Sequence, residues 1–232
     1  LNCTVPSVDG GASSYIGGIC GLNKASGTIK GTIVSDATIK GTSYVGGIVS
    51  ENFGSLEFDK NVGSLTVEAS GDLVGGIAGY NAGSIKNTAS SGNVEIKGTI
   101  NGRKNVGGVT GYMELTGGIS GFTNSAEITA ENTNAGGISG TYNNNKTSTP
   151  AISDCINNGQ ITSAGAAAGI VAVVSDKMIA LKNSTNFGYV KGSVSGGMVA
   201  LCDSAVSGSM DFEGCINHGR IYGSSYSGGM IA

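Results

Sequence analysis

Few side chains in this sequence could carry out acid–base, nucleophilic or metal chemistry. The one histidine, His218, lies in the turn string INHGR, so the chain offers neither two histidine ligands nor an H-E-x-x-H motif. A Ser-His-Asp triad would have to use His218 as its base, and nothing places a serine in a strained elbow beside it. The sequence therefore predicts no catalytic residue, no metal site and no cofactor, and we expect that the protein is not an enzyme.

Carboxylates are scattered along the chain instead of recurring at one position. Asp211 and Glu213 alternate, as do Glu57 and Asp59, so either pair could share one face of a strand. Paired carboxylates can cleave glycosidic bonds. Such alternation is also ordinary on a solvated surface, which is the interpretation we favour, and a polysaccharide-cleaving protein stays an alternative.

Three aromatic residues form the candidate ligand-binding site. Tyr80 and Tyr112 each stand five residues after the first glycine of a Gly-Gly pair, and Phe122 stands five residues after Gly117. Each lies an odd number of residues from the apolar residue of the same strand, and such residues lie on opposite faces of a strand. All three could therefore point outward as an aromatic strip. Aromatic rings stack on sugars and anchor protein interfaces, so the strip would suit either kind of ligand.

The elements that would position these rings are repeats. A Gly-Gly pair followed by an apolar residue recurs about every 30 residues, with one degenerate copy. The first residues of these pairs, which we call the anchors, are Gly17, Gly46, Gly75, Gly107, Gly136, Ala168, Gly196 and Gly228. Apolar residues stand two positions after every anchor, and the Gly-Gly pair is predicted to bend the chain because glycine lacks a Cβ atom.

Two further apolar columns follow the anchor within each repeat. The second column contains Ile29, Leu56, Ile85, Ile119, Ile152, Leu181 and Phe212. The third column contains Ile39, Leu65, Val94, Ile128, Ile161, Val190 and Ile221. Three short strands per repeat, about ten residues apart, describe a coil with three faces. The sequence therefore predicts an all-β parallel β-solenoid over residues 1–232, with about 30 residues per coil and seven to eight coils.

Composition agrees with this fold and excludes several functions. Glycine supplies 42 of 232 residues, and only 2 are proline. Glycine at this density would cost about 1 kcal/mol per site in a helix, and flexible linkers lack aligned apolar columns. The 13 basic and 16 acidic residues form no basic face, so nucleic acid is not an expected partner. No apolar run is long enough for a membrane-spanning helix.

Asparagine and cysteine positions follow the same alignment. Asn23, Asn52 and Asn81 share the sixth position after an anchor, where we expect turn formation and stacking of amide on amide along the axis. Cys155 and Cys215 are predicted to lie two coils apart, about 9.6 Å, which is too far for a disulfide. All five cysteines, including Cys3, are expected to be free thiols.

Several strings of the sequence resemble a known repeat family. The segments YVGGIVSENFGSL, LVGGIAGYNAGSIKNTASSGNVEIKG and DCINNGQI resemble the GLUG-motif repeat, most closely over residues 73–98, with departures at 113–150 and 172–182. That resemblance implies a secreted or surface-anchored bacterial protein, either an adhesin or a non-catalytic part of a large IgA-degrading metallopeptidase. It supplies no functional residues.

Together these observations predict a non-catalytic module on a bacterial cell surface. It would act as an adhesin-like binding surface or as a rigid spacer, with host glycans, host proteins or neighbouring surface proteins as partners. The alternative is a glycan-binding or polysaccharide-cleaving β-helix. Because no polar cap follows the last anchor, we also expect the chain to be a fragment of a longer protein.

Overall fold

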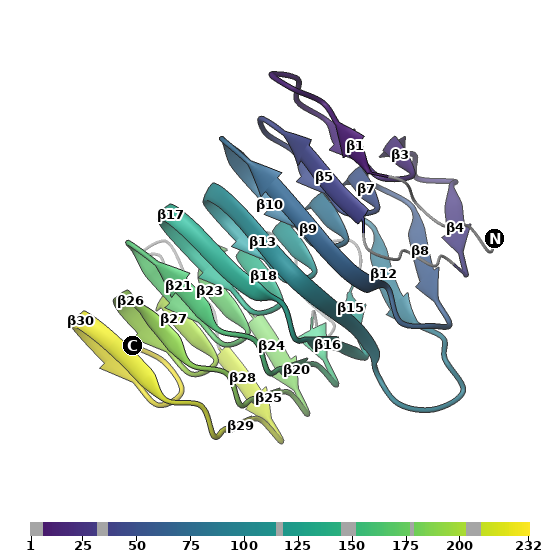
Figure 1. The fold of residues 1–232 in the computed structure, drawn as a ribbon. Coiled ribbons are helices and arrows are strands. Elements are labelled where there is room, and N and C mark those ends of the chain that lie inside the picture. Colours follow the sequence, from purple (N-terminus) through teal and green to yellow (C-terminus); the bar gives the residue numbers. More distant parts are fainter. Residues whose placement is uncertain (1–6, 32–36, 115–117, 145–151, 177–178, 203–209) are drawn as a thin grey trace.

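A computed structural model describes residues 7–31, 37–114, 118–144, 152–176, 179–202 and 210–232. The described residues form a parallel β-solenoid of about seven turns, with about 29 residues per coil and three sheets. Strands of successive coils stack along one axis, and the first and last described strands, β1 and β30, lie at opposite ends of that stack (Figure 1). The predicted fold class is confirmed.

Three parallel sheets form the faces of the coil. The first sheet has 16 strands, which are β1 (Val8–Asp9), β2 (Ile16–Gly17), β5 (Ala37–Gly41), β6 (Val45–Gly46), β9 (Gly63–Ala69), β10 (Asp72–Gly75), β13 (Val94–Gly107), β16 (Phe122–Asn124), β17 (Glu127–Gly136), β20 (Ile156–Asn157), β21 (Ile161–Ser163), β22 (Ala166–Ala168), β25 (Thr185–Asn186), β26 (Val190–Gly196), β29 (Ile216–Asn217) and β30 (Ile221–Gly228). The second sheet has seven strands, which are β3 (Cys20–Asn23), β7 (Val49–Asn52), β11 (Ala78–Asn81), β14 (Thr110–Glu114), β18 (Ser139–Asn144), β23 (Val171–Asp176) and β27 (Val199–Cys202). The third sheet also has seven strands, which are β4 (Thr28–Lys30), β8 (Ser55–Phe58), β12 (Ser84–Asn87), β15 (Ile119–Ser120), β19 (Ile152–Ser153), β24 (Ile179–Lys182) and β28 (Met210–Glu213).

The anchors form one continuous column, as predicted. Each anchor pairs in register with the anchor of the next coil, from Gly17 to Gly228. The chain leaves the first sheet at the anchor and enters the second sheet three residues later, so the Gly-Gly pair is the corner. A Cβ atom on Gly137, the second glycine of one pair, would overlap the backbone oxygen of Gly169 in the next coil. The second residue of the pair is therefore glycine because neighbouring backbones meet there, whereas the anchor position itself accepts Ala168.

The second apolar column is confirmed at every position. Ile29, Leu56, Ile85, Ile119, Ile152, Leu181 and Phe212 pair in register through the third sheet. Ile119 follows the additional Gly117-Gly118 pair and still occupies this column, so the extra pair does not shift the phase of the repeat. These side chains belong to, or pack against, one continuous apolar core that runs through the coils.

The third apolar column is wrong in two coils. Ile39 pairs with Val67 instead of Leu65, and Ile128 pairs with Ile100 instead of Val94. The two residues that were expected in this column, Leu65 and Val94, are nevertheless buried. Strands β9 and β13 each carry several inward apolar residues at alternating positions, so alternation alone does not fix which residue pairs across coils.

Buried asparagines form two hydrogen-bonded rows, which we call the asparagine ladders. In the predicted row, Nδ2 of Asn23 donates to Oδ1 of Asn52 at 2.8 Å, and Nδ2 of Asn52 donates to Oδ1 of Asn81 at 2.7 Å. A second row joins Asn124, Asn157, Asn186 and Asn217 with the same bond, each at 2.8 Å. The stacking prediction is confirmed for the first row, and the second row was not predicted.

Two further expectations concern cysteines and membranes. Cys20, Cys155, Cys202 and Cys215 are free thiols, whereas Cys3 lies outside the described residues. Within the described ranges there is no helix that is both long and apolar enough to cross a membrane.

Candidate functional site

Tyr80 and Tyr112 lie side by side on neighbouring strands of the second sheet. They are register partners on β11 and β14, and their rings are stacked with centroids 5.8 Å apart and planes inclined by 8°. Phe53 of the preceding turn packs against Tyr80 with a centroid distance of 5.6 Å. One face of Tyr80 therefore meets Tyr112, and Phe53 also packs against this ring.

Phe122 is not part of this cluster. Its side chain is 0 % exposed, and its ring packs edge-on against Phe58 with centroids 5.7 Å apart. The expectation that Phe122 points outward is wrong, because the strand that carries it does not belong to the second sheet. Phe122 begins β16, which joins the first sheet by pairing with Val94 of β13.

The two tyrosines form one wall of a pocket of about 280 Å³. Three other lining residues stand two positions before an anchor. Tyr44, Leu73 and Asn105 occupy this position in three successive coils, and all three have positive φ, at 54°, 62° and 54°. The lining residues are Tyr44, Leu73, Tyr80, Asn105, Tyr112 and Glu114.

Hydrogen bonds hold the polar side chains of the pocket in place. Tyr80 donates its hydroxyl proton to Oε2 of Glu114 at 2.6 Å, and the Tyr112 hydroxyl accepts from Nδ2 of Asn143 at 2.8 Å. Asn105 is only 8 % exposed, and its Oδ1 accepts from Nδ2 of Asn134 at 2.7 Å and from Oγ1 of Thr141 at 2.8 Å. No hydrogen bond donated by Nδ2 of Asn105 is found among the described residues.

Glu114 is the one charged side chain among the residues that line the pocket. Burial, followed by the hydrogen bond to Glu114 and its charge, raises the pKa of Tyr80 well above its ordinary value. Burial also raises the pKa of Tyr44, with smaller contributions from Tyr15 and Glu51. Both hydroxyls thus stay protonated at neutral pH. None of the ion pairs between described residues includes Glu51 or Glu114.

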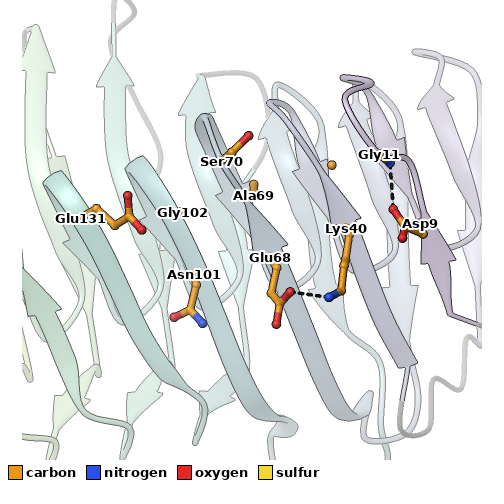
Figure 2. A pocket seen from close by; sticks show the side chains of 10 residues that line it. Asp9, Gly11, Lys40, Glu68, Ala69, Ser70, Asn101, Gly102 and Glu131 are labelled. Atoms are coloured by element: carbon orange, nitrogen blue, oxygen red, sulfur yellow. Dashed lines mark hydrogen bonds and ion pairs between the residues drawn. The ribbon is translucent and has the colours of Figure 1, made fainter.

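A second hollow, of about 420 Å³, lies on the outer face of the first sheet (Figure 2). Asp9, Lys40, Glu68 and Asn101 occupy directly paired positions on β1, β5, β9 and β13 across its floor. Nζ of Lys40 lies 2.8 Å from Oε2 of Glu68, and this hydrogen bond raises the pKa of Lys40. A lysine that is held protonated is a poor general base. Alternating charges in adjacent coils also keep like charges from lying directly opposite each other on neighbouring strands. We therefore infer that this row of side chains stabilises the sheet.

The carboxylate pairs expected from the sequence lie on solvated surfaces. Glu57 is bound to Lys30 at 3.4 Å, and Glu213 is bound to Lys182. Asp59 lies outside β8, so it does not share a strand with Glu57. Within the described residues, no group of three or more His, Cys, Asp or Glu side chains could hold a metal ion.

His218 lies in an Asn-x-Gly turn that follows β29. Its ring stacks on Phe187 of the preceding coil, with centroids 5.2 Å apart and planes inclined by 16°. Its backbone N–H donates to the backbone oxygen of Asn186 at 2.7 Å. This stacking is the same cross-coil packing that joins the tyrosines, and it places no nucleophile beside the imidazole.

Sequence reasoning missed four of the six pocket residues. Tyr44, Leu73 and Asn105 could have been found as a column two before the anchors, a column that also contains Tyr15 and Asn134. Glu114 had no such signal, because it lies at the end of β14 and is the only one of the six outside both columns. Comparison with protein-family models, with curated proteins and with solved structures finds no match to this chain.

Proposed function

We propose that this chain is a non-catalytic recognition module of a secreted or surface-displayed bacterial protein, and that the pocket between Tyr44 and the Tyr80–Tyr112 pair is its binding site. The observation that carries the proposal is the buried Asn105 side chain, which lines a tyrosine-walled pocket while its Nδ2 group donates to no described residue. Nδ2 of Asn105 is not among the buried, unpartnered side-chain atoms of the described residues, so solvent reaches it, and a ligand oxygen that displaces this solvent can accept its hydrogen bond.

The scaffold is suited to recognition because it holds the site without reorganisation. Tyr80 is fixed by its neighbours in two coils and by Glu114, and Asn105 is fixed by two hydrogen bonds. A pre-organised site loses less conformational entropy when a ligand binds. Resemblance to GLUG-motif repeats supports an extracellular, adhesin-like role with a host glycan, a host protein or a neighbouring surface protein as partner.

The test is a binding screen of the folded protein on a glycan array and on immobilised host matrix proteins. The Tyr112→Ala variant should lose binding, because it removes one wall of the pocket. Tyr226→Ala is the matched control, since Tyr226 is 68 % exposed on β30 and does not line the pocket. Equal binding by both variants would remove the pocket from consideration, and absence of any ligand would favour a rigid spacer.

A polysaccharide-cleaving protein is the second candidate, and the hollow in Figure 2 is the feature that would serve it. Asp9, Glu68 and Glu131 place three carboxylates around this hollow. The ion pair of Glu68 with a protonated Lys40 argues against a catalytic role for this hollow. Incubation with acidic and neutral polysaccharides, followed by an assay for new reducing ends, tests this candidate, and a Glu68→Gln variant should abolish any release that is found.

A further inference from the structure

We propose that the tyrosine pocket binds a single sugar unit through its hydroxyl groups and rejects sugars that carry a carboxylate. This inference rests on the proposed function and names the ligand class of the same site. It depends on the size of the pocket, on its hydrogen-bonding groups and on its charge.

The volume of the pocket matches one small ring. Pockets for drug-sized ligands occupy roughly 300–1,000 Å³, and this pocket, at about 280 Å³, is slightly smaller. The pocket is open to the surface, so the rest of a longer ligand can continue outside it. One terminal or branching unit of a glycan is the ligand that matches this volume.

The packing of the rings against one another disfavours ligands that need an open aromatic face. Tyr80 is stacked against Tyr112 and contacted by Phe53, and Tyr44 is stacked against Tyr15 with centroids 4.7 Å apart. A flat aromatic ligand or an organic cation binds over the face of a ring. These contacts reduce the free face area, so the rings act chiefly as an apolar wall.

The polar groups of the pocket include both donors and acceptors. Asn105 supplies an amide N–H donor, and Tyr44 supplies a hydroxyl that donates to no described residue. Glu114 accepts one hydrogen bond, from Tyr80 through Oε2, and can accept others. Each sugar hydroxyl both donates and accepts, so a sugar can satisfy this mixed set, whereas a purely cationic group cannot accept from Asn105.

Charge decides which sugars are accepted. Glu114 lines the pocket, and Glu51 is the register partner of Tyr80 in the preceding coil. No described basic residue forms an ion pair with either carboxylate. A uronic acid would bring its carboxylate into the pocket that Glu114 lines, and like charges repel each other.

The experiment compares matched sugars by saturation-transfer NMR and calorimetry at low ionic strength. The neutral probes are the methyl glycosides of glucose, galactose, mannose and N-acetylglucosamine, and the acidic probes are the methyl glycosides of glucuronic and galacturonic acid. We expect at least one neutral sugar to bind about tenfold more tightly than its uronic acid. Added salt should reduce this ratio.

Variants separate charge from shape. Glu114→Gln keeps a hydrogen-bond acceptor for Tyr80 and removes the negative charge. This variant should therefore reduce severalfold the ratio of the affinity for the neutral sugar to the affinity for its uronic acid. Glu127→Gln is the control, because this carboxylate is exposed on β17 and lines neither hollow. A uronic acid that binds as tightly as its neutral partner, or a ratio unchanged in Glu114→Gln, would overturn the inference while leaving the recognition site intact. If no sugar binds while a protein ligand depends on Tyr112, the inference fails and the proposed function stands. If no ligand depends on Tyr112, both fail.

Discussion

Asn52 donates a hydrogen bond from Nδ2 to Oδ1 of Asn81 at 2.7 Å, across 29 residues of sequence. The same side chain accepts from Asn23 on its other side, and its Oδ1 also accepts from the backbone N–H of Gly54 at 3.3 Å. Asn52 is completely buried, so its amide is satisfied entirely by protein. Each ladder asparagine thus links one coil to the next and closes the turn at its own corner.

The first prediction concerns the second asparagine ladder. Asn157→Ala should reduce the free energy of unfolding by about 2–4 kcal/mol, because it removes bonds to Asn124 and Asn186 and leaves a buried amide unsatisfied. Chemical denaturation measures this loss. Asn158→Ala is the control, since the neighbouring side chain is exposed in the same turn. Equal stability of the two variants would contradict a role for the ladder.

The second prediction concerns the Gly-Gly corner. Gly137→Ala should reduce the free energy of unfolding by about 3 kcal/mol, because the new Cβ atom would overlap the backbone oxygen of Gly169, which a side-chain rotation cannot relieve. Gly229 occupies the same position of the repeat, but nothing lies within 4 Å of the place that a methyl group on it would take. Gly229→Ala should therefore be nearly neutral in the same denaturation experiment. A small effect of both substitutions would show that close approach does not explain this glycine column.

The sequence was sufficient for the features that repeat once per coil and have one possible partner. The anchors and the second apolar column align without ambiguity because each repeat contains a single candidate residue. The third column failed at Leu65 and Val94 because a strand that alternates inward and outward residues offers two or three equivalent choices. Only the hydrogen-bond register between coils selects among them.

The third prediction concerns the thiol of Cys155. Complete burial raises its pKa to about 12 from an ordinary value of 9.0. The unfolded chain therefore ionises first as the pH rises, and stability that is complete below pH 9 is lost progressively towards pH 12. Between pH 9 and pH 10.5 the loss from this group should be about 2 kcal/mol.

Denaturation curves at these two pH values, recorded for the native protein and for Cys155→Ala, measure that contribution. The variant lacks the thiol, so its stability should decline less steeply over this interval, although Tyr80 and the other cysteines still contribute. If the free energy of unfolding falls equally with pH in the two proteins, Cys155 is accessible to water. Alkylation offers an independent check, since Cys155 should react only after unfolding.

The fourth prediction separates Phe122 from the tyrosine pocket. Phe122→Ala should destabilise the protein by about 3–5 kcal/mol, because it empties a fully buried position beside Phe58. Phe122→Leu keeps most of the apolar volume, so it should fold and retain ligand binding. Tyr112→Ala should show the opposite behaviour, with lost binding and a smaller loss of stability. Thermal melts and binding titrations on the three variants test this contrast.

The binding pocket was less predictable than the fold. Tyr80 and Tyr112 were identified because they share one position after the anchor, and the register of β11 and β14 brings them together. Tyr44, Leu73 and Asn105 could not be predicted as lining residues because they differ in chemistry and share only a left-handed backbone conformation. A left-handed conformation of a residue other than glycine or asparagine is hard to predict from the sequence. Glu114 is brought to the pocket by tertiary structure alone.

Every asparagine of a ladder carries both the group that gives and the group that receives the bond to its neighbour. One coil can therefore follow any other coil that has asparagine at this place, provided that its glycine corner and apolar columns also match. A gene duplication that copies one whole coil would extend the asparagine ladder and keep all of its hydrogen bonds. An insertion of half a coil would interrupt the ladder. The length of such a protein should thus evolve in whole increments of about 4.8 Å.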